Sequence, residues 1–555
     1  MKKNKYADWT RDDLIKRITS LEKRKKYGLV WNEERTKEKF ETDTDGKLPV
    51  LKEVKSKEIK TDSDKPTHIL IEGDNYHALS VLNYTHEKAI DVIYIDPPYN
   101  TGAKDWKYNN NYVDINDAYR HSKWLSMMSN RLSIAKRLLK KDGVLICTID
   151  ENEHARLGLL LERLFEGYEI HCITIVHNPR GVQGKNFSYT HEYAYFVFRN
   201  NLKVIGERKI KDDDIYWSNL RNWGGESKRE DAKNCFYPVI IENKEIIGFG
   251  DVVAQGVHPP KQTVSRNDKY YVYPIDKNGI ERKWRYARQS VEEVKNFLRA
   301  KKTKSGYEIE IGKNFGIVKT VWQDSRYDAN EYGTKIVHSL VPSANFDFPK
   351  SIYNTYDCIA PILSERKNAV VLDYFAGSGT TGHAAMILNK KDDGNRQIIL
   401  CTNNENNICT DVCHPRIKRV IEGHDSYPDI TNIPANLKYY RTAFVPAEPT
   451  DRNKELLTKE AVEMLCLREN AFEFVLENDS FKIYKNNQHY TGIIFDQLSI
   501  PKFKKAVSKF DLPTSVYVFS LSDDDFADEF ADMKKAVKVC SIPEAILRVY
   551  RRIFK

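Results

Sequence analysis

The chain has 555 residues, of which 41% are hydrophobic and 30% charged, as expected for a globular protein with several domains. It has no apolar run long enough for a membrane helix, and Met1-Lys2-Lys3-Asn4-Lys5 lacks the apolar stretch of a secretory signal. The nine cysteines follow no regular framework, so we predict a protein of the reducing cytoplasm with no membrane segment. The net charge of +9 is concentrated in residues 1–60 and 201–340, which favours contact with a polyanion.

The N-terminal region begins with a predicted helix. Thr10 and, three residues later, Asp13 form a start signal of the capping-box type. An apolar stripe at helical spacing follows and ends near Lys26. This stripe could pair two subunits or pack on its own domain. Residues 33–66 are charged and polar with few apolar anchors, which predicts a linker.

The next predicted strand, residues 69–72, closes on Gly73-Asp74 and precedes a helical pattern. An aspartate at this place has two possible roles. Asp74 could bind a cofactor, or it could cap the helix that follows.

A short β-branched run at residues 92–95 predicts a strand buried on both faces. Asp96-Pro97-Pro98-Tyr99 ends this strand, because two prolines prevent both a helix and further strand pairing. The chain therefore leaves rigidly from the carboxyl end of the strand, where open α/β sheets bind their ligands. A carboxylate, a proline carbonyl and an aromatic ring at this corner can hold a planar group with an exocyclic amine. The alternative is a simple strand-to-loop corner with a surface tyrosine.

Strand and helix patterns then alternate up to residue 198, which predicts a parallel, doubly wound sheet. The expected helices lie at residues 124–139 and 150–165, and the expected strands at residues 143–149, 168–176 and 192–198. A loop at residues 178–187 is rich in glycine, basic and aromatic residues and suits contact with a base and a phosphate. Lys185 and Phe187 are its candidates for DNA contact, and ordinary loop packing is the alternative.

Residues 200–340 break the strand–helix rhythm and are rich in Tyr, Trp, Asn and basic side chains. Arginine and asparagine can read base edges in the major groove, whereas lysine mostly holds phosphate. Arg221, Arg229 and Arg285 are therefore candidates for DNA contact. A solvated charged surface is the alternative for each of them.

A second ligand-binding pattern lies at residues 373–381, after the predicted strand 369–372 and before a helical stretch. Gly377 and Gly379 allow a backbone to approach a ligand closely, and the N-terminus of the following helix favours negative charge. Glu405, beyond the strand 397–400, is the acidic side chain placed to accept hydrogen bonds from ribose hydroxyls.

Cys401, Cys409, Cys413 and His414 cluster in the sequence without the C-x-x-C pairs of common zinc sites. We therefore favour buried or free thiols and predict no metal. Residues 446–555 contain strand and helix patterns but no catalytic constellation, so they could bind a partner or DNA, or complete the fold.

The Asp96-Pro97-Pro98-Tyr99 corner, followed later by Phe375-Ala376-Gly377-Ser378-Gly379, resembles the β-class amino-methyltransferases of DNA. More closely, the chain resembles the modification (Mod) subunit of type III restriction–modification systems over about residues 65–445. The supporting matches are Gly73-Asp74-Asn75, residues 96–102, Gly184-Lys185-Asn186-Phe187, Thr190-His191-Glu192-Tyr193, Phe236-Tyr237-Pro238, Tyr332-Gly333-Thr334 and residues 373–381.

The resemblance implies a Rossmann-like S-adenosylmethionine-dependent methyltransferase sheet of the α/β class, split by an inserted α+β target-recognition domain. The expected domains are an N-terminal helix and linker (1–62), the first part of the methyltransferase (63–200), the target-recognition domain (201–340), the second part of the methyltransferase (341–445) and a small α/β C-terminal domain (446–555). It implies catalysis by Asp96, Pro97, Pro98 and Tyr99, and cofactor binding by Asp74, Asp373, Phe375, Ala376, Gly377, Gly379, Thr380 and Glu405. It also places the loop at residues 178–187 beside the pocket for an extruded adenine, where Phe187 or Tyr189 could stack opposite Tyr99.

The implied function is methylation of adenine N6 in a specific site of double-stranded DNA, with S-adenosylmethionine as the methyl donor. The chain would be the modification subunit of a type III-like restriction–modification system or a solitary methyltransferase, and RNA is a further possible substrate. N4-cytosine methylation is one alternative, although that group more often has serine where Asp96 stands. A non-catalytic DNA-binding specificity subunit is the alternative from another class. A second copy of the chain is one possible partner. A helicase–nuclease restriction subunit is another, since the chain itself shows no helicase or nuclease signature and cleavage would have to come from another polypeptide.

Overall fold

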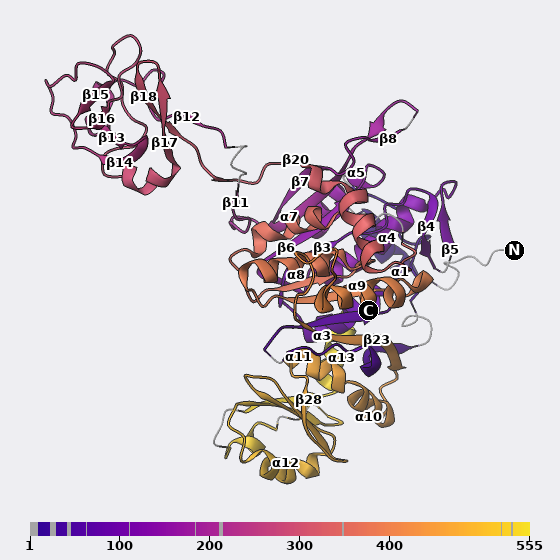
Figure 1. The fold of residues 1–555 in the computed structure, drawn as a ribbon. Coiled ribbons are helices and arrows are strands. Elements are labelled where there is room, and N and C mark those ends of the chain that lie inside the picture. Colours follow the sequence, from indigo (N-terminus) through magenta and orange to yellow (C-terminus); the bar gives the residue numbers. More distant parts are fainter. Residues whose placement is uncertain are drawn as a thin grey trace. The chain divides into compact units, whose positions relative to one another are not determined.

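The computed structural model describes residues 9–22, 29–40, 46–62, 64–109, 111–183, 185–209, 215–346, 349–522, 524, 526–533 and 537–554. The chain divides into two compact units, which are described separately (Figure 1). The first comprises residues 1–205 and 319–555, and the second comprises residues 206–318.

A mixed β-sheet forms the centre of the first unit and has ten strands within the described residues. In spatial order they are β1 (Lys47–Glu53), β23 (Asn436–Pro446), β2 (Thr67–Glu72), β22 (Gln397–Thr402), β21 (Val370–Asp373), β3 (Ile90–Ile95), β6 (Leu139–Ile149), β10 (His191–Arg199), β7 (Tyr168–Val176) and β20 (Val321–Gln323). The strands from β23 to β6 run parallel, whereas β1 and β10 run antiparallel to their neighbours. The predicted α/β class and doubly wound sheet are confirmed, with these two antiparallel strands as the difference.

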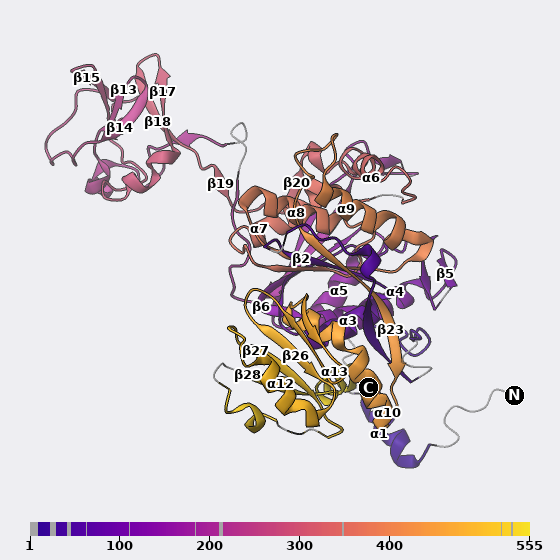
Figure 2. The same cartoon turned by 60° about the horizontal axis from the view of Figure 1, so that its bottom comes forward.

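Helices cover both faces of this sheet (Figure 2). One layer contains α7 (Ile352–Leu363), α8 (Thr380–Asp392) and α9 (His414–Glu422), and the other contains α3 (Asn75–Thr85), α4 (Arg120–Ala135) and α5 (His154–Leu164). The strands between the two layers are buried on both faces, as their nearly continuous apolar sequences predict. The fully buried Trp124 on α4 belongs to the core beneath β3.

The N-terminal helix α1 (Arg11–Glu22) begins as its capping signal predicts. The Thr10 hydroxyl donates to the Asp13 carboxylate over 2.6 Å, and the Asp13 N–H donates to Thr10 Oγ1 over 3.2 Å. The predicted end near Lys26 lies outside the described residues.

The prediction of a linker at residues 33–66 is wrong for a large part of that segment. β1 pairs with β23, and Leu51 on β1 is fully buried. Phe40 stacks on Tyr76 of α3 with 3.7 Å between ring centroids. The charged residues between these apolar positions conceal the strand in the sequence, because the partner strand β23 lies almost 400 positions later and supplies the pairing.

Residues 446–555 complete the fold of the first unit. They form α10 (Asp451–Glu460), α11 (Val462–Glu469), α12 (Ile500–Val507), α13 (Glu544–Ile553) and a sheet in the order β24 (Glu473–Glu477), β25 (Phe481–Lys485), β26 (Tyr490–Ile494), β27 (Thr514–Phe519) and β28 (Val537–Ile542). Ile546 of α13 and Leu465 of α11 share one core with Leu79 of α3. The Tyr550 hydroxyl donates to the Pro49 carbonyl of β1 over 2.5 Å.

The second unit is mainly β-structure. Its sheets contain β12 (Ser218–Asn219), β18 (Gly306–Ile311) and β17 (Leu298–Thr303), and β14 (Glu245–Phe249), β13 (Val239–Glu242), β16 (Lys269–Val272) and β15 (Thr263–Arg266). Its described residues contain short 3-10 helices but no α-helix. It is shorter than the predicted insertion at residues 201–340, because β20 joins the central sheet and α6 (Lys335–Leu340) packs with the first unit. None of the described helices in either unit has the length and apolar character needed to cross a membrane.

Candidate functional site

The two ligand-binding motifs predicted from the sequence lie side by side at one edge of the central sheet. β3 and β21 are adjacent parallel strands, with Val92 opposite Val371 and Ile93 opposite Leu372. The segments that follow β3 and β21 leave the sheet at the same edge, so Asp96 and the loop after Asp373 border one region. A third motif also reaches this region, since the Asn75 amide donates to the carbonyl of Tyr374 over 2.8 Å.

The corner after β3 is held by hydrogen bonds to buried side chains. Trp124 Nε1 donates to the Pro98 carbonyl over 2.7 Å. Asn100 has a left-handed φ of 59° and is fully buried, and its amide donates to Glu153 Oε1 over 2.5 Å. Trp106 Nε1 donates to Asn100 Oδ1 over 3.0 Å. These contacts fix the backbone on which Asp96 and Tyr99 are carried.

Asp96 is the carboxylate of this corner, with 28% of its side chain exposed. Its Oδ1 accepts a hydrogen bond from Thr148 Oγ1 of β6 over 2.6 Å, and Lys350 Nζ lies 3.4 Å away. Burial raises the pKa of Asp96, while the charge of Lys350 opposes that rise. The carboxylate is therefore tied to two neighbouring elements and has a cation close by.

Tyr99 lies in a polar network that the sequence did not predict. Its hydroxyl donates to Glu192 Oε2 over 3.0 Å, and Asn354 Nδ2 donates to Glu192 Oε1 over 2.7 Å. Lys350 donates to both Tyr99 and Glu192, and its Nζ lies 4.5 Å from the centroid of the tyrosine ring. A glutamate at the start of a buried strand pattern was the signal that could have revealed this network.

The glycine loop after β21 has the backbone geometry that only glycine adopts easily. Gly377 and Gly379 have φ values of 49° and 81°, and Gly379 caps the N-terminus of α8. A Cβ at Gly377 would lie 3.2 Å from the ring of Phe346. The N–H of Ala376 donates to the carbonyl of Cys401 over 3.1 Å, which ties the loop to the end of β22.

Asp373 holds this loop from within. Its Oδ1 accepts from the N–H of Phe375 over 2.9 Å, and its Oδ2 accepts from Thr381 Oγ1 over 2.5 Å. Burial raises the pKa of Asp373 to about 7. Both carboxylate oxygens thus have partners inside the loop, so the side chain shapes the loop for a ligand.

Arg416 of α9 anchors the other end of the glycine loop. Its Nη1 donates to Thr380 Oγ1 over 2.7 Å and to Ser378 Oγ over 3.0 Å, and its side chain is fully buried. The sequence did not reveal this role, because nothing near Arg416 in the sequence signals a contact with residues 378–380.

Asp74 and Glu405 flank the loop and are both partly exposed. Asp74 caps α3 by accepting from the N–H of Tyr76 over 2.8 Å, and its second oxygen lies 3.4 Å from Arg131 Nη2. The helix-capping alternative is therefore present in the structure, with 47% of the side chain still exposed. Glu405 has 43% of its side chain exposed and lies 3.6 Å from Lys107 Nζ.

Residues 90–413 match the profile of the DNA methylase family, N6_N4_Mtase. The chain belongs to this family. It is 31% identical over 381 residues to the type II methyltransferase M.KpnI of Klebsiella pneumoniae, a match that covers 65% of this chain and 84% of that protein. It is 28% identical over 405 residues to the type III restriction-modification enzyme EcoPI Mod subunit of Escherichia phage P1, covering 64% of this chain and 60% of that subunit.

Among solved structures, the chain is similar to the cytosine-N4-specific PvuII DNA methyltransferase, with 12% identity, a TM-score of 0.32 and coverage of 68% of this chain and 98% of that one. The chain spans less than two thirds of the length of the EcoPI Mod subunit. The predictions of a DNA methyltransferase and of a likeness to Mod subunits are confirmed.

In this DNA methylase, the loop at residues 178–187 belongs to a hairpin of β8 (Val182–Gln183) and β9 (Ser188–Tyr189) that projects from the first unit (Figure 1). Phe187 is 78% exposed and Tyr189 46% exposed, and Lys185 is also exposed. Gly184 lies outside the described residues. The hairpin leads directly into β10, which carries Glu192 of the Tyr99 network.

Two of the three arginines predicted to contact DNA stabilise the fold of the second unit instead of facing solvent. Arg221 has only 4% of its side chain exposed, and its Nη1 donates to the carbonyl of Ile275 over 2.6 Å. Arg229 pairs with Glu281 over 2.9 Å and donates to backbone carbonyls of residues 253–257. Arg285 is exposed and donates to Ser218 Oγ over 2.9 Å. A single sequence shows where the arginines stand, but not which backbone carbonyls their guanidinium groups contact in the folded chain.

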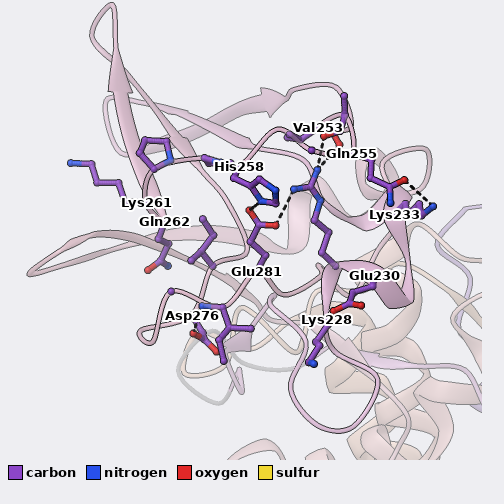
Figure 3. A pocket seen from close by; sticks show the side chains of 18 of the residues that line it. Lys228, Glu230, Lys233, Val253, Gln255, His258, Lys261, Gln262, Asp276 and Glu281 are labelled. Atoms are coloured by element: carbon purple, nitrogen blue, oxygen red, sulfur yellow. Dashed lines mark hydrogen bonds and ion pairs between the residues drawn. The ribbon is translucent and has the colours of Figure 1, made fainter.

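Arg229 forms part of the wall of an open pocket of about 960 Å³ in the second unit (Figure 3). Basic and amide side chains border this pocket: Lys228, Lys233, Gln255, His258, Lys261 and Gln262. Lys233 Nζ donates to Gln255 Oε1 over 3.1 Å, and His258 Nδ1 lies 3.0 Å from Glu281 Oε1.

The cysteine cluster is built of free thiols. Cys401, Cys409 and Cys413 are buried, and Cys409 Sγ lies 3.3 Å from the Tyr439 hydroxyl. His414 Nε2 lies 2.9 Å from the Lys57 carbonyl.

Proposed function

We propose that the protein transfers a methyl group from S-adenosylmethionine to N6 of an adenine in a specific site of double-stranded DNA. One observation carries the proposal: the Asp96–Tyr99 corner and the glycine loop leave adjacent parallel strands at the same edge of the sheet. An acceptor for an amine and a loop for a methyl donor can then serve one reaction.

The residues of the glycine loop fit S-adenosylmethionine. Gly377 and Gly379 place backbone groups where any side chain would crowd Phe346 or Cys413. The partly exposed carboxylates of Asp74 and Glu405 are acceptors suited to hydroxyl and amino groups. Asp373, Phe375, Ala376 and Thr380 would complete the cradle. When bound, the cofactor supplies an electrophilic methyl group on a sulfonium.

Asp96 and the Pro97 carbonyl provide two acceptors for the hydrogens of the target amine. The lone pair of that amine is delocalised into the base, which makes it a poor nucleophile. Acceptors on both hydrogens draw the nitrogen toward tetrahedral geometry and stabilise the positive charge that develops on it. Pro98, held by Trp124, keeps the backbone of these acceptors rigid.

Tyr99 offers a face on which the base can stack. A target base inside the duplex must first be flipped out, at a cost of about a few kcal/mol. Stacking on an aromatic side chain recovers about 1–3 kcal/mol per base. The hydrogen bond from the Tyr99 hydroxyl to Glu192 fixes the plane of the ring for this role.

We expect N6-methyladenine as the product, because aspartate occupies position 96 where N4-cytosine enzymes more often have serine. Duplex DNA methylated by the purified protein should be digested to nucleosides and separated by mass spectrometry. N4-methylcytosine in place of N6-methyladenine would contradict the choice of base. Long-read sequencing of DNA from cells that express the chain would give the methylated base and the recognition sequence together.

The alternative function is a DNA-binding subunit without catalysis, and a cofactor titration separates the two. We expect saturable binding of S-adenosylmethionine, because the glycine loop is intact and anchored at both ends. A protein that binds duplex DNA but neither binds this cofactor nor forms methylated product would support the alternative.

The β8–β9 hairpin supplies DNA contacts in this proposal, with Phe187 and Lys185 facing solvent close in sequence to Glu192. We expect Phe187→Ala to weaken duplex binding by about fivefold to 150-fold, since stacking on one aromatic side chain is worth about 1–3 kcal/mol. Fluorescence anisotropy with labelled duplex measures this change.

Phe474→Ala is the matched control, because Phe474 is 55% exposed on the edge strand β24 of the C-terminal sheet. Cofactor affinity should stay unchanged in both variants. Equal duplex affinity for Phe187→Ala and wild type would remove the hairpin from the DNA-binding surface.

We further propose Arg285 and the basic pocket residues of the second unit as DNA contacts, and a restriction subunit and a second copy of the chain as protein partners. The DNA contacts rest on exposure and charge, and the restriction subunit rests on the names of the Mod relatives. The homodimer rests on the apolar stripe of α1, where Leu14, Ile15 and Ile18 are exposed. An enzyme that modifies chromosomal DNA would act in the cytoplasm. Light scattering of the purified chain, alone and with duplex, tests the homodimer.

A further inference from the structure

Lys350 brings one ammonium group to three members of the proposed base site. Its Nζ donates to Tyr99 and Glu192 and lies 3.4 Å from Asp96 Oδ1. The same atom lies 4.5 Å from the centroid of the Tyr99 ring and is hydrogen-bonded to the ring's hydroxyl, so it lies at the hydroxyl edge of the ring. Only 14% of the side chain is exposed.

The backbone at Lys350 is clamped, whereas its side chain is long and flexible. A Cβ on Gly333 would lie 2.2 Å from the Pro349 carbonyl oxygen and 3.0 Å from that of Lys350. Gly333 therefore has to be glycine for this segment to pack, which explains the Tyr332-Gly333-Thr334 motif. Ser351 Oγ, one residue later, donates to the carbonyl of Arg326 over 2.7 Å. The four-carbon stem carries the ammonium from this fixed backbone to Asp96, Tyr99 and Glu192.

The charges around Lys350 explain why a cation is needed here. Asp96 and Glu192 are two carboxylates in one buried region, and like charges at close range disfavour ionisation of both. Burial would raise the pKa of Glu192, but Lys350 and then His177 outweigh it, and the net shift is downward. Burial would lower the pKa of Lys350, but Asp96 and Glu192 outweigh it, and the net shift is upward. The titratable groups coupled to this centre are Tyr94, Asp96, Tyr99, Cys147, Asp150, His177, Glu192 and Asp373.

We propose that Lys350 is a positioning residue of the methyl-transfer reaction, which keeps Asp96 ionised and holds the Tyr99 hydroxyl and Glu192 in place beside it. This inference rests on the proposed function. The ammonium is hydrogen-bonded to the Tyr99 hydroxyl at the edge of the ring, so it can keep its place when a base stacks on the ring face. Glu192 retains it, because that carboxylate is fixed by Asn354 on its other oxygen. Asp96 then meets the target amine in its ionised, accepting form.

The test is the pH dependence of single-turnover methylation by Lys350→Met and Lys350→Arg. The ionised carboxylate is the stronger acceptor and supplies the negative charge that stabilises the developing cation, so activity falls as pH drops through the pKa of Asp96. Removing the cation should move this acid limb upward by about one pH unit or more, since an opposite charge within ~4–6 Å commonly shifts a carboxyl pKa by about 1–3 units. K350R should restore the wild-type limb, and the KM for duplex should change little in either variant.

Lys140→Met is the matched control. Lys140 Nζ pairs with Asp91 Oδ2 over 2.7 Å near the opposite end of β3, so the same type of ion pair is lost away from the site. The acid limb of K140M should match wild type. Circular dichroism and cofactor affinity verify folding, and K350Q replaces K350M if the latter does not fold.

An acid limb of K350M or K350Q that coincides with wild type, with the rate lowered equally at every pH, would overturn the inference and leave Lys350 a structural role. The inference is overturned in the same way if K350R fails to restore the limb. Failure of the proposed function looks different, because the wild-type chain would then form no methylated base at any pH.

Discussion

Asp96→Ala is expected to lower the rate of methyl transfer by about 100-fold to 1,000-fold or more, the usual cost of removing a group that stabilises transition-state charge. The variant loses the acceptor for one hydrogen of the target amine. It also leaves Lys350 with the Tyr99 hydroxyl and Glu192 as partners, because Asp96 Oδ1 is one of the oxygens near its ammonium. Single-turnover incorporation of a labelled methyl group into duplex DNA measures the effect.

Folding, cofactor affinity and duplex affinity should survive this substitution, because the corner is held by Trp124 and Asn100 and not by Asp96. Asp142→Ala is the control, since Asp142 is an exposed aspartate that pairs with Arg366 over 3.1 Å. It should methylate like wild type. Full activity of Asp96→Ala would reject the mechanism, and loss of duplex or cofactor binding would assign Asp96 a different role.

The parts of the site that sequence reasoning found are those with local signals. Two prolines after a β-branched run mark the end of a buried strand, and two glycines between a strand and a helix mark a ligand loop. Because both motifs follow strands of a parallel sheet, we expect them at the same edge of that sheet. The structure places them side by side, since β3 and β21 are neighbouring strands.

The parts that the sequence did not reveal depend on tertiary contacts. Lys350 and Glu192 lie 158 positions apart and meet at Tyr99 only because α7 and β10 flank β3 and β6 in the folded chain. The role of Arg416 requires knowledge that α9 packs beside the start of α8. β1 is hidden for the same reason, since its hydrogen-bonding partner β23 comes from the far end of the methyltransferase.

The arginines of the second unit show a further limit of predicting DNA contacts from amino-acid composition. Arg221 and Arg285 look equivalent in a basic, aromatic segment, yet one is buried against the carbonyl of Ile275 and the other is exposed. A guanidinium has five donors, and backbone carbonyls can satisfy them as well as phosphates can. Which of these occurs depends on the turns of the second unit, and those turns carry weak sequence signals.

Gly379→Ala should weaken the binding of S-adenosylmethionine by about tenfold or more. Gly379 has a φ of 81°, and a left-handed conformation costs an alanine about 1–2 kcal/mol. The new Cβ would also lie 3.1 Å from the buried Cys413 Sγ, which has little room to move. The loop relieves this strain by leaving the conformation that begins α8, so the backbone groups that face the cofactor are displaced. Isothermal titration calorimetry measures the change in affinity.

Gly225→Ala controls for the substitution itself, because nothing lies within 4 Å of the position of its Cβ and it lies in the second unit. Its cofactor affinity should equal that of wild type. Gly379→Ala should keep duplex affinity, since Phe187 and Arg285 are untouched, and its methylation rate should recover in part at high cofactor concentration. An unchanged cofactor affinity in Gly379→Ala would mean that the methyl donor binds away from this loop, and the juxtaposition of β3 and β21 would no longer explain catalysis.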